Sequence, residues 1–230
     1  MVWGLELPYE FGTFFPDGDF VGYRDQLDAA FDAMSAEEQA YYGNLKPAYR
    51  FHVSQCFTFE HGTMHGEQRV FRPVAEHEWP GEFQMRRRYK SLGALIKTVN
   101  ALLLVEKRFK DILERLEPGV HQFSPVKLTL PNDEVYPAEY FTIVIGTFLT
   151  SFDPRQSDEA SFTRLGSYRS KHFDAEKSSK LAFSKSVLDR HHLWRERELK
   201  TPHLFLSDTL RSEVIKAGLT LPTHFQMMEV

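Results

Sequence analysis

The apolar run YFTIVIGTFL, at residues 140–149, constrains the fold more than any other part of this chain. Most of its side chains are β-branched or aromatic, and such residues favour a strand over a helix. A strand whose side chains do not alternate between polar and apolar is buried on both faces. The sequence therefore predicts a central strand at residues 140–149.

The composition is that of a folded globular protein. The 230 residues fit one large domain or two small ones, and 42% of them are hydrophobic. Phe, Tyr and Trp number 20, 9 and 3, so we expect a sheet-rich core and no extensive disorder. The formal net charge of −4 weighs against a dedicated nucleic-acid-binding surface.

Cysteine usage and the absence of long apolar segments predict a cytoplasmic protein. Cys56 is the single cysteine, so no internal disulfide can form and a reducing compartment is expected. The first residues do not combine a basic segment with an apolar run, as a signal peptide does. No stretch reaches the roughly 18 apolar residues of a membrane helix, so we expect no membrane partner.

In the N-terminal part, apolar spacing predicts helices followed by strands. Apolar residues three and four apart predict a helix over residues 27–34. A second short helix begins at Ser35, where Glu38 completes a capping box. Residues 49–59 alternate strictly and predict a half-buried strand, in which Cys56 is a structural thiol. Further strands are expected at residues 69–75 and 83–89.

From Ser91 the apolar spacing becomes helical. It predicts one helix over residues 92–103 and a second over residues 109–116, ended by Pro118. Because Pro125 lacks a backbone N–H, the strand that contains it is expected at a sheet edge. Residues 150–161 are polar and predict a loop. Strands are expected at residues 121–128, 181–188, 191–195, 203–206 and 224–230, and a last helix at residues 208–217.

These elements predict an α+β fold with a mostly antiparallel sheet covered by amphipathic helices. Residues 103–128 and 204–230 resemble each other, since each runs from an apolar strand through an amphipathic helix to a strand containing Phe. They predict an internally repeated strand-helix-strand unit. We expect residues 1–90 to form a variable α+β region that packs as one compact unit with a domain at residues 91–230.

The second half of the chain also resembles a bacterial protein family. LLVEKRFKDILE and FSPV, within residues 103–126, are similar to that family's L-V-S-E-R-F-K-D-x-L-E and F-x-P-V motifs. HHLWRERE and LFLSDTLRSEVIKAGLT, within residues 191–220, are similar to its h-h-L-W-R, L-F-V-S-D-x-L and A-G-L motifs. This is the eleventh family of polymorphic-toxin immunity proteins, and the similarity spans roughly residues 90–230.

The matching positions read as a structural motif of that family. They include Phe109, Phe123, Pro125, Ser207 and Gly218. The family usually has Ser where this chain has Glu106, whose charge can still favour a helix N-terminus. The family's recurring Trp corresponds to Trp194.

The resemblance implies a protein that binds a toxin and catalyses no reaction. Members are encoded beside toxins that are injected into rival bacteria, and they protect the producer by binding the cognate toxin. Many such toxins are nucleases with basic clefts, which an acidic surface would fit by analogy. We therefore expect a partner-binding surface, although simple solvation of the acidic loop is the alternative. The expected residues are Asp153, Asp158, Glu159, Trp194 and Glu196.

Two other functions remain open on the sequence alone. The pair His61 and His65, or His191 and His192 with Asp189, could serve a metal site or a hydrolase. Neither set has further ligands at a convincing spacing, so we expect no metal and no cofactor. The basic run at residues 86–90, RRRYK, could contact nucleic acid. A charged edge strand is the commoner explanation of such a run, so we expect no nucleic-acid partner.

Overall fold

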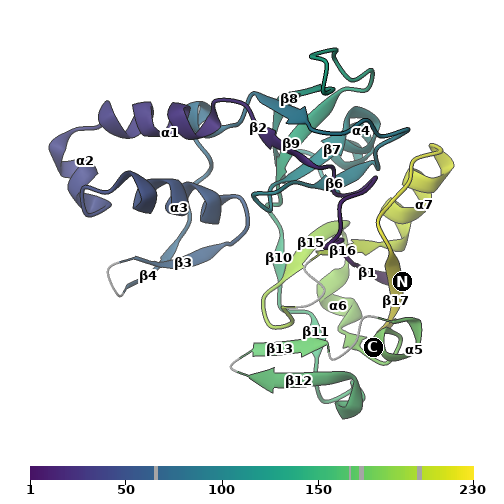
Figure 1. Ribbon diagram of the computed structural model, residues 1–230. Helices are drawn as coiled ribbons and strands as arrows, with labels where there is room; N and C mark the ends of the chain where they lie inside the picture. The colour runs from purple at the N-terminus through teal and green to yellow at the C-terminus, as the bar shows by residue number, and fades with distance from the viewer. Residues whose placement is uncertain (65–66, 166, 171–173, 201–203) are drawn as a thin grey trace.

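The structure, a computed structural model, describes residues 1–64, 67–165, 167–170, 174–200 and 204–230. In these ranges the chain is an α+β protein dominated by a seven-stranded and a six-stranded sheet (Figure 1). The predicted α+β class is therefore confirmed. No helix in these ranges combines the length and the apolar character that a membrane span requires.

Most strand pairs in the two sheets are antiparallel, and β10–β15, β14–β17 and β5–β8 are parallel. The seven-stranded sheet has the order β10 (Phe148–Leu149), β15 (Leu193–Glu196), β16 (Leu204–Ser207), β1 (Val2–Leu5), β17 (His224–Glu229), β14 (Ala182–Phe183) and β11 (Phe152–Asp153). The six-stranded sheet has the order β2 (Gly18–Phe20), β5 (Glu82–Met85), β8 (Gln122–Thr129), β9 (Tyr140–Val144), β7 (Leu103–Glu106) and β6 (Leu95–Lys97).

A helical lobe projects from the two sheets (Figure 1). We use this name for residues 23–70, which contain α1 (Tyr23–Asp32), α2 (Ala36–Tyr41), α3 (Lys46–Cys56) and the hairpin of β3 (His61–Met64) and β4 (Glu67–Val70). The remaining elements are α4 (Lys107–Leu116), α5 (Ala175–Ser178), α6 (Lys185–Leu188), α7 (Asp208–Lys216), the 3₁₀ turns η1 (Glu76–Glu78) and η2 (Glu159–Ser161), and the hairpin of β12 (Phe162–Leu165) and β13 (Ser167–Ser170).

In each large sheet, a helix connects two strands that flank a third, antiparallel strand. The helix α4 connects β7 to β8 around β9, and α7 connects β16 to β17 around β1. The two helices contact each other, and Phe109 and Leu113 of α4 share one buried core with Leu210 and Val214 of α7. The descent of the two units from one repeated segment stays a prediction.

The helical lobe is built onto the six-stranded sheet through a second core. Leu27 and Phe31 of α1 and Val53 of α3 lie in the same buried cluster as Phe83 of β5 and Leu128 of β8. A third cluster lies on the seven-stranded sheet and contains Trp194 and Phe205. The position of the lobe is therefore determined by apolar contacts with the sheet as well as by the chain that connects them.

The prediction of a strand at residues 49–59 is wrong, because this segment forms the C-terminal part of α3 and the turn after it. Its buried side chains, Tyr49, Val53 and Cys56, are four and three residues apart and so lie on one helical face. Alternate apolar residues would place Phe51 on the same face as Tyr49, yet Phe51 is exposed. The apolar set satisfied both periods, and packing on the lobe core selected the helical one.

The prediction of a helix over residues 92–103 is also wrong, because the segment forms the antiparallel hairpin of β6 and β7. Its turn closes through a hydrogen bond from the Thr98 amide to the Leu102 carbonyl (2.9 Å), with Ala101 in a left-handed conformation (φ 58°). Strand β7 also pairs with β9, and this pairing satisfies the backbone N–H and C=O groups of β7. Local apolar spacing gives no information about such a distant strand partner.

The predicted central strand at residues 140–149 exists only as far as Val144. At Gly146 the chain leaves the six-stranded sheet, and Phe148 begins β10 in the seven-stranded sheet. A Cβ atom at Gly146 would lie 1.9 Å from the Val120 carbonyl oxygen, so this crossing requires glycine.

The prediction that Pro125 lies in an edge strand is wrong, because its strand, β8, lies between β5 and β9. Strand β5 pairs with β8 only from Lys127 onward, however. Pro125 therefore pairs with β9 on one side and has no strand partner on the side of β5.

Several helix predictions that rest on local signals are confirmed. Ser35 and Glu38 form the predicted capping box of α2. The helix predicted at residues 109–116 is α4, and the helix predicted at residues 208–217 is α7. The remaining strand predictions shorten or shift to β4, β5, β14, β15, β16 and β17, and α6 replaces the end of the strand expected at residues 181–188.

Candidate functional site

A cleft lies between the helical lobe and the seven-stranded sheet. Its volume is about 720 Å³, and it is the candidate functional site, which we call the central cleft. One wall is the segment after α3, residues 58–61, and the opposite wall is β15 with the residues that follow it, residues 195–200. Leu7, Tyr9, Lys97, Ala101, Phe148, Ser167 and Arg169 complete the lining.

An ion pair joins the two walls of the central cleft. The guanidinium of Arg197 donates two hydrogen bonds of 2.6 Å to the carboxylate of Glu60. The hydrogen bond from Arg197 lowers the pKa of Glu60, and the same contact raises the pKa of Arg197. Bidentate geometry of this kind fixes the orientation of both side chains. The pair therefore holds the lobe against the sheet at the mouth of the cleft.

Arg195, in β15, has no such carboxylate partner among the described residues. It is only 8% exposed, and its Nε atom has no hydrogen-bond partner there. Burial lowers the pKa of Arg195 to about 10, so the guanidinium still carries its charge at neutral pH. The adjacent Glu196 forms no ion pair with Arg195, since neighbouring residues of a strand point to opposite faces. Its carboxylate accepts hydrogen bonds from the amide and the hydroxyl of Ser151 instead (2.9 and 2.6 Å). Burial raises the pKa of Glu196.

Further positive charge surrounds Arg195 in the central cleft. The ammonium of Lys97 lies over the rings of Tyr9 and Phe15, 5.3 and 4.8 Å from their centroids. Arg169 and Lys200 are exposed at the rim. In the described part of the chain, none of these three side chains forms an ion pair with a carboxylate. The cleft is therefore locally basic in a protein whose formal net charge is −4.

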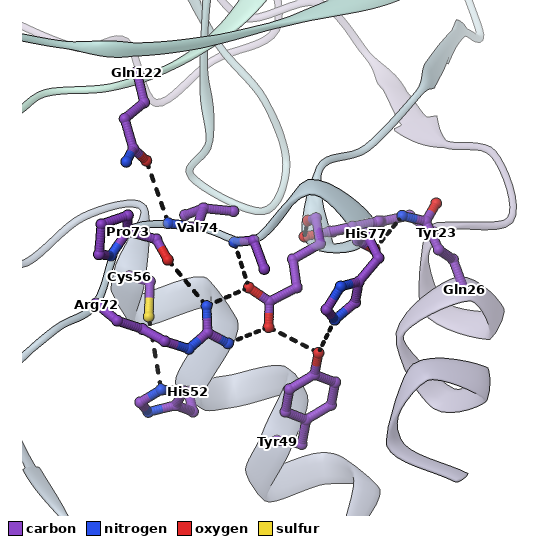
Figure 2. Close-up of polar contacts among 12 residues, drawn as sticks. Tyr23, Gln26, Tyr49, His52, Cys56, Arg72, Pro73, Val74, His77 and Gln122 are labelled. Carbon is purple, nitrogen blue, oxygen red and sulfur yellow. Dashed lines mark hydrogen bonds and ion pairs between the residues drawn. The ribbon is translucent and has the colours of Figure 1, made fainter. Parts of the chain in front are cut away.

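A buried carboxylate holds the lobe side of the cleft in place (Figure 2). Glu78 is 0% exposed, and its carboxylate accepts two hydrogen bonds from Arg72, one of them 2.7 Å long. It also accepts hydrogen bonds from the hydroxyl of Tyr49 (2.8 Å) and the amide of Ala75 (2.9 Å). Burial alone would raise the pKa of Glu78, but these hydrogen bonds outweigh it and lower the pKa.

The same network connects the lobe to the rest of the fold. The hydroxyl of Tyr23, in α1, donates to the backbone carbonyl of Glu78 (2.7 Å). The amide of Val74 donates to the side chain of Gln122, in β8 (3.2 Å), as Figure 2 shows. The contacts around this one anion thus join four parts of the fold: helices α1 and α3, residues 72–78 and the six-stranded sheet.

The thiol of Cys56 lies next to this network but is not an activated nucleophile. Its Sγ atom is 3.7 Å from Nε2 of His52, one turn earlier in α3 (Figure 2). Burial raises the pKa of Cys56 to about 11 and lowers the pKa of His52. Both shifts favour the neutral forms, so a thiolate–imidazolium pair is not formed at neutral pH.

Trp194 and Glu196, which the sequence suggested as partner contacts, are interior residues. Trp194 is 0% exposed and stacks on Phe205, with ring centroids 5.9 Å apart. Glu196 is buried against Ser151. All four residues of β15 are buried. Trp194 is enclosed in the third core, whereas Glu196 contributes to the lining of the central cleft. A role of the two residues in partner binding stays a prediction.

Residues 150–161, predicted as a loop, contain the short strand β11 and the 3₁₀ turn η2, and the three acidic residues of this acidic loop lie outside the lining of the central cleft. The carboxylate of Asp153 accepts hydrogen bonds from the amide of Arg155 (2.9 Å) and the side chain of Gln156 (3.0 Å). The hydrogen bond from Gln156 lowers the pKa of Asp153. Asp158 caps η2 through the amide of Ala160 (2.9 Å). Both residues thus stabilise the loop, and Glu159 is exposed beside them.

The residues of the expected structural motif lie in the two strand-helix-strand units. Phe109 is buried in the core between the units, and Phe123 lies below the ammonium of Lys110 (5.2 Å to the ring centroid). Ser207 caps α7 by accepting a hydrogen bond from the Leu210 amide (3.1 Å), and Gly218 follows the helix with a φ of 70°. Glu106 precedes α4 without a side-chain capping hydrogen bond and pairs with Arg108 (2.8 Å).

The histidines considered as metal ligands do not form a cluster. His65 lies outside the described residues, and His192 pairs with the hydroxyl of Ser207 (2.8 Å). His191 is 3.8 Å from Glu117, whereas the side chain of Asp189 faces Arg190 (3.8 Å). Within the ranges that the structure describes, no group of three or more His, Cys, Asp or Glu residues could hold a metal ion.

The basic run at residues 86–90 is largely neutralised by nearby carboxylates. Arg86 and Arg87 pair with Asp17 (3.5 and 3.3 Å), and Arg88 pairs with Glu134 (2.9 Å). In the central cleft, by contrast, the described residues place no carboxylate in ion-pair contact with Lys97, Arg169, Arg195 or Lys200. Sequence reasoning missed the cleft because its residues come from distant segments. One sequence signal pointed to it: Arg195 is two residues after the apolar Leu193 in a strand, so both side chains lie on the same, inward-facing side of that strand.

The chain matches a known protein family over most of its length. The profile of the immunity protein family (Imm11) matches residues 28–229. A search of curated proteins finds no match. The matched range contains both walls of the central cleft and the whole Glu78 network except Tyr23.

We expect the substitution Glu78→Gln to destabilise the protein by about 2–4 kcal/mol at neutral pH, because it removes the charge that Arg72 pairs with in the interior. The folded state lowers the pKa of Glu78, so this stabilisation is present above the pKa of the unfolded chain and is lost as pH falls through the folded pKa. Urea unfolding of both proteins between pH 7 and pH 3 measures the difference, which should shrink on acidification.

The exposed neighbour Glu76 provides the control, because Glu76→Gln changes the same functional group in the same 3₁₀ turn. Its stability should remain within about 0.5 kcal/mol of the wild type. Equal stability of the Glu78→Gln and Glu76→Gln proteins at pH 7 would contradict the structural role of the buried carboxylate.

Proposed function

This chain belongs to the immunity protein family (Imm11), and we infer that it neutralises a cognate bacterial toxin by binding it directly. The family match over residues 28–229 is the observation that carries this proposal. Neutralisation by binding needs a rigid surface that complements the toxin, and it needs no reaction. We propose that the chain acts in this way in the cytoplasm, without a metal or cofactor.

The architecture supports a binding role. The lobe and the seven-stranded sheet are held together by apolar packing, by the Glu78 network and by the Glu60–Arg197 pair, so the central cleft has fixed walls. A preformed site binds with a smaller loss of conformational entropy than a mobile one. We also propose that residues 1–90 and 91–230 act as one unit, since β1, β2 and β5 are integral strands of the two sheets.

The proposal is tested with the gene that lies beside the one for this chain. If that gene encodes a toxin domain, its expression in bacterial cells should stop growth, and co-expression of this chain should restore it. The purified proteins should form a complex of fixed stoichiometry by size-exclusion chromatography with light scattering. Unprotected cells, or the absence of a complex, would contradict the proposal.

The acidic loop gives a second, finer proposal, that the toxin is a nuclease whose basic cleft faces Asp153, Asp158 and Glu159. Because Asp153 and Asp158 hold backbone amides, the substitutions Asp153→Asn, Asp158→Asn and Glu159→Gln remove charge and keep hydrogen-bond acceptors. We expect the triple variant to bind the toxin about tenfold more weakly in calorimetry, with a thermal midpoint close to that of the wild type.

A matched control removes three exposed carboxylates from the helical lobe and η1. The substitutions are Asp25→Asn, Glu37→Gln and Glu76→Gln. This protein should bind with wild-type affinity, because the loss of net charge is the same but its location differs. Equal affinities of the two triple variants would remove the acidic loop from the interface.

A further inference from the structure

Arg195 is a buried charge without an ion-pair partner in the part of the chain that the structure describes. The residue is 8% exposed, its Nε atom has no hydrogen-bond partner, and no described carboxylate lies within ion-pair distance of it. A buried guanidinium without a partner destabilises a fold, and for this reason proteins usually pair such groups. Glu78, which is buried still more deeply, accepts hydrogen bonds from three groups and shows how completely this chain satisfies a charge elsewhere.

The unpaired guanidinium lines the central cleft and is not enclosed in the core. Arg195 shares the lining with the apolar side chains of Leu7, Phe148 and Leu199. Two aromatic side chains stand at the rim, Tyr9 (78% exposed) and Phe59 (43% exposed). A buried arginine surrounded by apolar and aromatic groups is the composition typical of the energetic centre of a protein interface.

The charge of the cleft selects the sign of the group that would enter it. Lys97, Arg169 and Lys200 add positive charge around Arg195, and none of them forms an ion pair in the described ranges. The lining contains two carboxylates, and both already have partners: Glu60 is paired with Arg197, and Glu196 accepts hydrogen bonds from Ser151. An entering group that satisfies Arg195 must therefore be an anion.

We propose that the central cleft receives an acidic segment of the cognate toxin, with an Asp or Glu carboxylate of that segment paired to Arg195. This inference rests on the proposed function, and it names the chemistry of the partner at one site. A carboxylate matches the guanidinium in bidentate geometry, and the apolar walls accommodate the rest of the side chain.

A nucleic acid fits the cleft less well than a protein segment. Binding of a phosphate backbone relies on several exposed basic residues spaced along it. Here the central cation is buried, the exposed basic residues without an ion pair are two at the rim, Arg169 and Lys200, and the protein has a formal net charge of −4. Nucleic-acid binding is therefore an alternative outcome of the test.

The test measures binding of a catalytically inactivated toxin domain, from the adjacent gene, to the full-length chain. The substitution Arg195→Met removes the charge and keeps an apolar side chain of similar length. We expect toxin binding to weaken by about 10–100-fold, because the partner's carboxylate is left unpaired in the complex. The midpoint of thermal unfolding should rise by about 2–4 °C, because the free chain no longer buries an unpaired charge.

A rim variant keeps the test independent of the folding of Arg195→Met. Arg169→Glu combined with Lys200→Glu changes two exposed side chains of the cleft, and the control Lys90→Glu with Lys185→Glu makes the same charge change outside it. We expect the rim variant to bind about tenfold more weakly, mainly through slower association, and the control to bind like the wild type.

Each result decides between defined alternatives. If the wild type binds and protects but the Arg195 and rim variants bind equally well, the cleft proposal is overturned and the proposed function stands. If the wild type neither binds nor protects, both are overturned. Wild-type binding to a single-stranded oligonucleotide that Arg195→Met abolishes, with toxin affinity unchanged, would assign the cleft to nucleic acid instead.

Discussion

The architecture of this protein depends on the pairing of one buried anion. The carboxylate of Glu78 accepts hydrogen bonds from Arg72, Tyr49 and the amide of Ala75, and its backbone carbonyl holds Tyr23. These groups come from two helices and the segment that returns to the six-stranded sheet. A carboxylate in the interior is tolerated only when it is satisfied in this way. The lobe is thereby fixed at one position, and with it one wall of the central cleft.

Two of the buried charged side chains, Glu78 and Arg195, differ in how the fold pairs them. Glu78 is fully paired in the free chain, whereas Arg195 is buried almost as deeply and has no partner at Nε. Departures from local satisfaction are expected at functional sites, where a fold keeps a group in readiness for its ligand. The unpaired arginine lies between walls that the Glu78 network and the Glu60–Arg197 pair hold in place. The stabilising contacts of the Glu78 network and of the Glu60–Arg197 pair thus offset the destabilising burial of Arg195.

Sequence reasoning succeeded where the signal is local and failed where tertiary pairing decides. The capping box at Ser35, the helices α4 and α7 and the strand β16 follow from caps and periodicity within a few residues. In α3 and in the β6–β7 hairpin, the apolar residues fit both helical and strand spacing, and the partner strands or helices made the choice. The family resemblance identified the class of function. It could not identify the cleft, because residues as distant as Tyr9 and Lys200 meet only in the folded chain.

The central claim, that this immunity protein engages its toxin through the central cleft, is tested most directly by hydrogen–deuterium exchange. Amide exchange is followed in the free chain and in its complex with the inactivated toxin domain. The account predicts slower exchange in the complex for both walls, residues 58–61 and 195–200. A complex in which these segments exchange as in the free chain, with protection confined to another surface such as residues 150–161, would contradict it.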